Sequence, residues 1–192
     1  YVKKALDESD ESLRDGNMAK AYRCLGETMH LLADMGCPVH VRNDSHAPSM
    51  ALGAMGDPDP YESYMVESVV TAKKGGTAEP HLKDQFKSAD RAEALFETMA
   101  VFTNENFFTN QTISGMGVEQ IDPIIDDQPA YPKPKLDDPD MEYVPDEFAF
   151  YKTFPSGARV KMCKDHSYFN FRGYPYVDKE CADSQAAVLI PN

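Results

Sequence analysis

Three residues at the end of a predicted helix have types and spacing suited to binding a zinc ion. His30 and Asp34 are four residues apart in a well-patterned helix, which places them on one face, one turn apart. His40 follows a helix stop at Gly36 and Pro38, where the chain can fold back toward that face. Imidazole and carboxylate groups bind zinc, and bridged zinc pairs are found in two-metal hydrolytic sites. The pattern therefore predicts a metal site in which Asp34 also has a catalytic role.

Two further residues extend the predicted site along the chain. His46 lies six residues beyond His40, so three of the five histidines fall between residues 30 and 46. Glu62 follows Asp59-Pro60 at a predicted helix start, where a carboxylate can close a capping box or bind a metal. Simpler interpretations are open for the whole set. His30 and Asp34 would then be an ion pair at the edge of the core, His46 a loop histidine and Glu62 a capping residue.

The sequence around these residues resembles the zinc-dependent phospholipase C family. The stretches "LGETMHLLADMGCPVHVRNDSHAP" and "GDPDPYE" carry the resemblance, and the family signature H-x3-D-x3-P-x-H is matched by His30, Asp34, Pro38 and His40. The resemblance implies a zinc-dependent hydrolase that cleaves phosphodiesters with a metal-activated water, on a helical fold shared with the fungal single-strand nucleases. It also implies up to three zinc ions, with His30 and Asp34 in one part of the cluster and Asp34 bridging two metals.

The resemblance assigns roles to the downstream residues as well. In the family, the second histidine of the signature begins the third zinc site, which a histidine and a carboxylate at the start of the next helix complete. Glu62 matches that carboxylate, whereas Pro58 stands where the histidine is expected. The resemblance therefore implies that His46 substitutes as a zinc ligand from the loop.

The chain departs from the family upstream of His30. The family carries an N-terminal zinc ligand, two histidines and an aspartate before the signature, but residues 1–29 contain no histidine. A missing N-terminal segment, a partner that completes the site, or a degenerate family member would each explain this. The start at Tyr1 favours a fragment. The degenerate case leads to the alternative function, a non-catalytic structural or self-assembling extracellular protein on a phospholipase C-like scaffold.

The charge of the chain limits its partners. The net charge is −13 and the isoelectric point is near 4.7. A strongly acidic surface repels nucleic acid at long range, so the favoured substrate is a phospholipid or another phosphodiester rather than nucleic acid. No stretch is long and apolar enough for a transmembrane segment. An extracytoplasmic or secreted location is expected.

The patterning of the chain predicts a mainly α protein, and the resemblance implies that its helical core is phospholipase C/nuclease-like, with a Pro/Asp-rich extended segment and a small β-hairpin near the C-terminus. Residues 1–110 are expected to form this metal-site core, with helices over residues 2–14, 17–35, 59–72 and 88–108. The second of these helices carries an apolar stripe expected to face the core. Its members are Met18, Ala21, Tyr22, Leu25, Met29 and Leu32.

Residues 111–192 are expected to pack on the same domain with a different character. Residues 122–146 are rich in Pro and Asp, which predicts an extended acidic connection. Residues 147–164 alternate around Pro155-Ser156-Gly157 and predict a small β-hairpin. The final stretch "DSQAAVLIPN" begins an apolar C-terminal helix.

The four cysteines are not arranged as a zinc site, because no CxxC pair occurs. Cys24 lies among apolar neighbours in a predicted helix and is expected to be a small core residue. Cys163 and Cys181 flank a loop segment rich in Tyr and Gly, and two alternatives are open for them: a disulfide, which an extracytoplasmic location permits, and free thiols.

Overall fold

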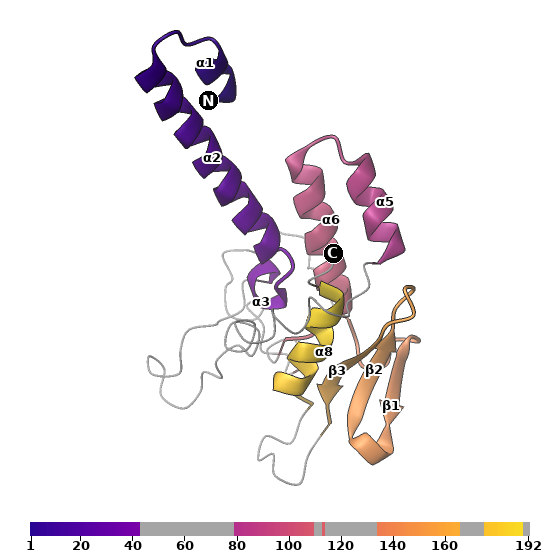
Figure 1. Cartoon of the computed structure of the whole chain (residues 1–192). Coiled ribbons are helices and arrows are strands. Elements are labelled where there is room, and N and C mark those ends of the chain that lie inside the picture. The colour runs from indigo at the N-terminus through magenta and orange to yellow at the C-terminus, as the bar shows by residue number, and fades with distance from the viewer. Residues whose placement is uncertain (43–78, 110–112, 114–133, 166–174, 190–192) are drawn as a thin grey trace, which may run out of the picture. The chain divides into compact units, whose positions relative to one another are not determined.

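The chain forms two compact units, Tyr1–Asp34 and Met35–Asn192. The structure, a computed structural model shown in Figure 1, describes residues 1–42, 79–109, 113, 134–165 and 175–189. The helix predicted over residues 59–72 lies outside the described residues.

The first unit is a helical hairpin. Helix α1 (Val2–Leu6) packs against α2 (Glu11–Asp34), and Ala5 of α1 is buried. Asp10 caps α2, since its Oδ1 accepts a hydrogen bond of 2.9 Å from the Leu13 amide. The helix continues through Gly16, where the sequence predicted a break between two helices. A single glycine inside a helix costs only about 1 kcal/mol relative to alanine, so it does not by itself end the helix.

Three of the six residues of the apolar stripe of α2 are exposed in the described part of the chain, and the other three are half-buried. Tyr22, Leu25 and Met29 are each more than half exposed, and α2 buries no residue among those described. Cys24 is exposed too, so the expectation of a core cysteine is wrong. A stripe with helical period identifies the apolar face of a helix, but it does not specify what packs on that face.

Three helices precede the sheet in the second unit. Helix α3 (Pro38–Val41) is a single turn, and α5 (Pro80–Ser88) and α6 (Ala92–Asn106) form a hairpin in Figure 1. Pro80 stands at the start of α5, where a missing amide donor costs nothing. Leu82 of α5 is buried, as are Met99 and Phe102 of α6.

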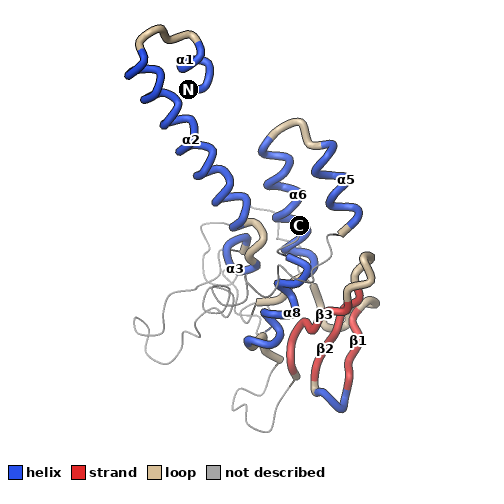
Figure 2. The backbone as a smooth tube through the Cα atoms, in the orientation of Figure 1, coloured by secondary structure: helices blue, strands red, loops and turns tan. Residues whose placement is uncertain are grey.

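A three-stranded antiparallel sheet follows, drawn in red in Figure 2. Its order is β1 (Met141–Val144), β2 (Ala149–Thr153) and β3 (Arg159–Lys164). β2 and β3 pair over the residues where the sequence predicted a hairpin. The turn between them is closed by a hydrogen bond of 2.8 Å that the Phe154 amide donates to the Ala158 carbonyl. Gly157 in this turn has a φ of 84°, a backbone conformation that favours glycine.

Helix α8 (Lys179–Leu189) covers one face of β3. Two polar side chains of α8 bond to the backbone of this strand. Gln185 Nε2 donates to the Met162 carbonyl at 2.6 Å, and Ser184 Oγ accepts from the Lys161 amide at 2.8 Å. The buried side chains of α8 are Cys181, Ala182, Gln185, Ala186, Val188 and Leu189.

An aromatic cluster joins α6 to the hairpin turn. Phe107, directly after α6, is fully buried and stacks on Phe154 with ring centroids 5.5 Å apart. Nearby, the buried carboxylate of Glu79 accepts hydrogen bonds from the hydroxyl and the amide of Ser156, so the start of α5 is tied to the same turn. A buried carboxylate is stable only when it is paired in this way.

The expectation of a phospholipase C/nuclease-like helical core with only a small β-hairpin is wrong, although the six helices of the described residues are roughly compatible with a mainly α class. The second unit contains a three-stranded sheet with α8 packed on it, rather than a helical core with a small two-stranded hairpin. The extra strand is β1, which lies inside the stretch predicted as an extended acidic connection. The sequence on both sides of Met141–Val144 is rich in Pro and Asp, which predicted an extended connection instead of a strand. Such residues are tolerated beside an edge strand, although they are rare in a buried one.

Cys163 and Cys181 are free thiols in this structure, buried where β3 meets α8. Burial raises the pKa of the Cys163 thiol to about 12, and burial also raises the pKa of the Cys181 thiol. Because the thiolate is the reactive form, we expect a disulfide-exchange reagent to label exposed Cys24 rapidly and these two only after unfolding. Peptide mapping by mass spectrometry measures this order. A disulfide would contradict the prediction by leaving both cysteines unlabelled in denaturant without reductant.

Candidate metal site

The structure brings His30 and Asp34 together on the last turns of α2. Their closest side-chain atoms, Nε2 and Oδ2, are 3.7 Å apart. The His30 side chain is 78% exposed, whereas that of Asp34 is 23% exposed. The helical spacing alone produces this pairing, since residues four apart are neighbours on a helix surface. The pair is therefore accessible to an ion from solvent.

The geometry of this pair fits a shared zinc ion. Zinc binds imidazole nitrogen and carboxylate oxygen at about 2.0–2.2 Å in tetrahedral sites, which places two ligand atoms roughly 3.4 Å apart. The observed separation of 3.7 Å is reached from that value by a small side-chain rotation. Two such ligands would occupy half of the positions of a tetrahedral site and would leave the others for further ligands or for substrate.

His40 lies on α3, in the second unit. This single turn begins at Pro38, which is fully buried, and Val39 beside it is buried too. His40 itself is half-buried. The other two predicted ligands, His46 and Glu62, lie outside the described residues. Within the described ranges, no three His, Cys, Asp or Glu side chains form a group that could hold a metal.

Helix α6 holds the segment that carries His40. Thr103 Oγ1 donates a hydrogen bond of 2.7 Å to the Met35 carbonyl, and Arg42 Nη2 donates to the Asn104 carbonyl. Thr103, Asn104 and Arg42 are all buried. Sequence reasoning missed these contacts, because they join residues more than 60 positions apart. The only local signal was a Thr and an Asn inside an otherwise apolar helix face, where each needs a partner.

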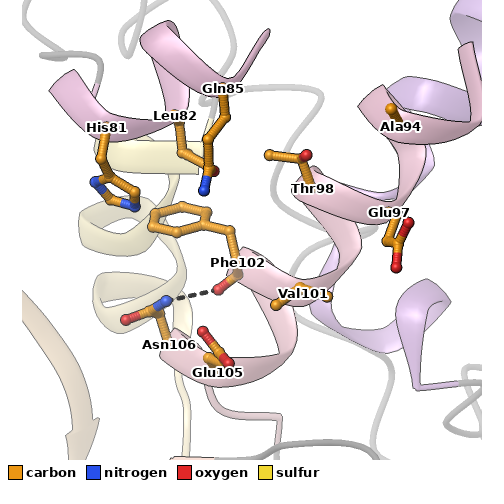
Figure 3. A pocket seen from close by; sticks show the side chains of 10 residues that line it. All are labelled: His81, Leu82, Gln85, Ala94, Glu97, Thr98, Val101, Phe102, Glu105 and Asn106. Atoms are coloured by element: carbon orange, nitrogen blue, oxygen red, sulfur yellow. Dashed lines mark hydrogen bonds between the residues drawn. The ribbon is translucent and has the colours of Figure 1, made fainter. Parts of the chain in front are cut away.

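A groove of about 360 Å³ between α5 and α6 has a different composition (Figure 3). The ring of His81 meets Phe102 edge-on, with centroids 5.8 Å apart, and Leu82 and Val101 also line the groove. Its two carboxylates, Glu97 and Glu105, both come from α6. His81 therefore packs on an aromatic ring in this groove, and the groove has no arrangement of the kind found at His30 and Asp34.

A second cluster of charged groups lies beside the sheet. Lys161 forms ion pairs with Glu180 and, at 3.3 Å, with Glu147, while Tyr151 donates a hydrogen bond to Glu147. Burial alone would lower the Lys161 pKa, but hydrogen bonds to Glu180, Tyr151 and Glu147 outweigh burial and raise it. The hydrogen bond from Tyr151 and that from Lys161 lower the pKa of Glu147.

These shifts in the sheet cluster indicate a structural role. A general acid or base works best when its pKa lies near the operating pH. Here the pKa of the lysine moves up and that of the carboxylate moves down, so both groups stay charged at neutral pH. The cluster therefore ties η3 (Pro145–Glu147) and α8 to the sheet.

No helix among the described residues is long and apolar enough to cross a membrane. Comparison with known protein families, with curated proteins and with solved structures finds no significant match to this chain.

Proposed function

We propose that this protein is a zinc-dependent phosphodiester hydrolase. The observation that carries the proposal is the His30–Asp34 pair, whose 3.7 Å separation suits two ligands of one zinc ion. His40 follows Asp34 by six residues and supplies a third candidate ligand. His46 and Glu62 are the remaining candidates, and the resemblance to zinc-dependent phospholipases C supports all five.

The chemistry follows from the residue types. Bound zinc supplies a nucleophilic hydroxide at neutral pH and neutralises charge that develops on the phosphoryl oxygens. The imidazoles of His30 and His40 would bind zinc through nitrogen as neutral ligands and would leave the positive charge of the ion uncompensated. Asp34 would add one negative charge and a second oxygen, so that it could bind the ion and accept a hydrogen bond from the attacking water. This is why Asp34 is the candidate catalytic residue.

The substrate class follows from charge. With a net charge of −13, the protein repels polyanions, and a phospholipid with a neutral or zwitterionic headgroup meets less repulsion than nucleic acid. An extracytoplasmic or secreted location is part of the proposal. A segment or partner that supplies further ligands would complete the zinc cluster.

The test combines zinc content with turnover. We expect purified protein, with its intact mass verified, to contain at least one zinc ion per chain by elemental mass spectrometry. We also expect it to hydrolyse p-nitrophenylphosphorylcholine, and to lose this activity with 1,10-phenanthroline and regain it with added zinc. Protein without zinc that also fails to bind added zinc would rule out the proposal.

One observation favours a second candidate, a structural or self-assembling protein. Tyr22, Leu25 and Met29 expose apolar surface on one face of α2 in the described part of the chain. Contiguous exposed apolar surface commonly marks an interaction site. This candidate predicts concentration-dependent oligomers by light scattering, with no chelator-sensitive hydrolysis.

A further inference from the structure

We propose that Thr103 and Arg42 are positioning residues, which clamp the His40 segment to the end of α6 and so set the metal affinity of His40. This inference rests on the proposed function. It adds residues that lie outside the H-x3-D-x3-P-x-H pattern.

The two hydrogen bonds of the clamp bracket α3. On one side, Thr103 Oγ1 donates to the carbonyl of Met35, which is three residues before Pro38, at 2.7 Å. On the other side, Arg42, the residue directly after α3, donates to the carbonyl of Asn104. Consecutive residues of α6 thus bond to both flanks of the turn that carries His40.

Each bond satisfies a carbonyl at a helix end. The last carbonyls of a helix have no partner within the helix. Met35 directly follows the end of α2, and Asn104 lies in the last turn of α6. The last turn of α6 contains no basic residue of its own, so Arg42 supplies the cation that a helix C-terminus favours. The clamp is therefore built on groups that would otherwise need water.

The short helix α3 depends on such anchors for its orientation. It has 4 residues, and a single turn is unstable in isolation because nucleation fixes many dihedral angles for one hydrogen bond. The burial of Pro38 and Val39 holds one side of the turn. The clamp holds its two flanks, and Arg42 is only 8% exposed, so its guanidinium is fixed by burial as well. These contacts therefore fix the backbone position of His40.

A hydroxyl deletion tests the clamp. In Thr103→Val the side chain keeps its shape but loses the donor, and we expect zinc affinity to fall by about 10–100-fold, as for other residues that orient metal ligands. Thr103→Ser keeps the hydroxyl and should restore most of the affinity. Thr98→Val is the matched control, since it makes the same change on the same helix but lines the α5–α6 groove. Its affinity should equal that of the wild type.

The measurement is competition against a chromophoric zinc chelator, at a temperature where circular dichroism shows each variant folded. If Thr103→Val does not fold, Arg42→Lys decides the question, because it keeps the charge and much of the stem but loses the planar fork. We expect a similar loss of affinity for Arg42→Lys. Unchanged affinity in the folded variant overturns the clamp and leaves the proposed function standing. Wild-type protein that binds zinc without hydrolysis overturns the function alone, and wild-type protein that binds no zinc overturns both.

Discussion

Replacing His30 by alanine is expected to weaken zinc binding by more than about 100-fold, with a matching loss of chelator-sensitive phosphodiester hydrolysis. Loss of a residue that merely orients a metal ligand already costs about 10–100-fold, so loss of a ligand should cost more. Asp34→Asn keeps the shape of the side chain and removes its charge. We expect it to bind zinc less tightly and to reduce kcat further at saturating zinc, because Asp34 also orients the attacking water.

The control for the ligand variants is another exposed histidine. His81 packs on Phe102 in the groove between α5 and α6, so His81→Ala should leave zinc content and turnover unchanged. Zinc per chain and hydrolysis rate are measured on the same preparations. Equal zinc content in wild type and His30→Ala would show that the ion is held elsewhere, and would remove the His30–Asp34 pair from the site.

Phe107→Ala is expected to lower the free energy of unfolding by about 3–5 kcal/mol, the usual cost of removing a large buried aromatic side chain. Phe107 is fully buried, meets Phe102 edge-on at 5.6 Å and stacks on Phe154. The ring therefore connects the end of α6 to the turn between β2 and β3. Its removal leaves a cavity between elements that are far apart in the sequence.

The comparison for Phe107 is Val101→Ala on the same helix. Val101 is 41% exposed, and alanine has the higher helix propensity, so this change should alter stability by less than about 1 kcal/mol. Urea unfolding followed by circular dichroism measures both variants. Similar midpoints for the two would contradict the conclusion that the aromatic cluster stabilises the junction of α6 with the hairpin turn.

The local features of the site could be predicted from the sequence. The side-chain positions of a helix repeat every 3.6 residues, so a histidine and an aspartate four apart meet on one face wherever the helix packs. His30 and Asp34 do so here. Chain reversal at Pro155-Ser156-Gly157 was equally local, because Gly157 takes a positive φ that other residues avoid. Expectations of this kind depend only on covalent geometry and near neighbours.

Features that depend on distant partners could not be predicted in this way. Met141–Val144 becomes a strand because its backbone pairs with β2. Tyr143 and Val144 favour strands, but the Asp- and Pro-rich sequence around them does not indicate that pairing. The α2 stripe predicted burial, yet Tyr22 and Met29 are exposed in the described part of the chain, because an apolar stripe does not specify what covers it. The expectation of a helical core with only a small hairpin was wrong because β1 adds a third strand to a sheet on which α8 packs.

The sequence by itself determined which groups could bind a metal, since the types and spacing of His30, Asp34 and His40 are local facts. Only the tertiary structure decided what holds the segment that carries His40. Thr103 and Arg42 are 61 residues apart in numbering (103 − 42), and neither belongs to the motif. Their hydrogen bonds go to main-chain carbonyls, which every residue has. The residue types of the accepting positions therefore do not indicate which carbonyls are bonded. The carbonyls that are bonded are determined by the packing of α3 against α6.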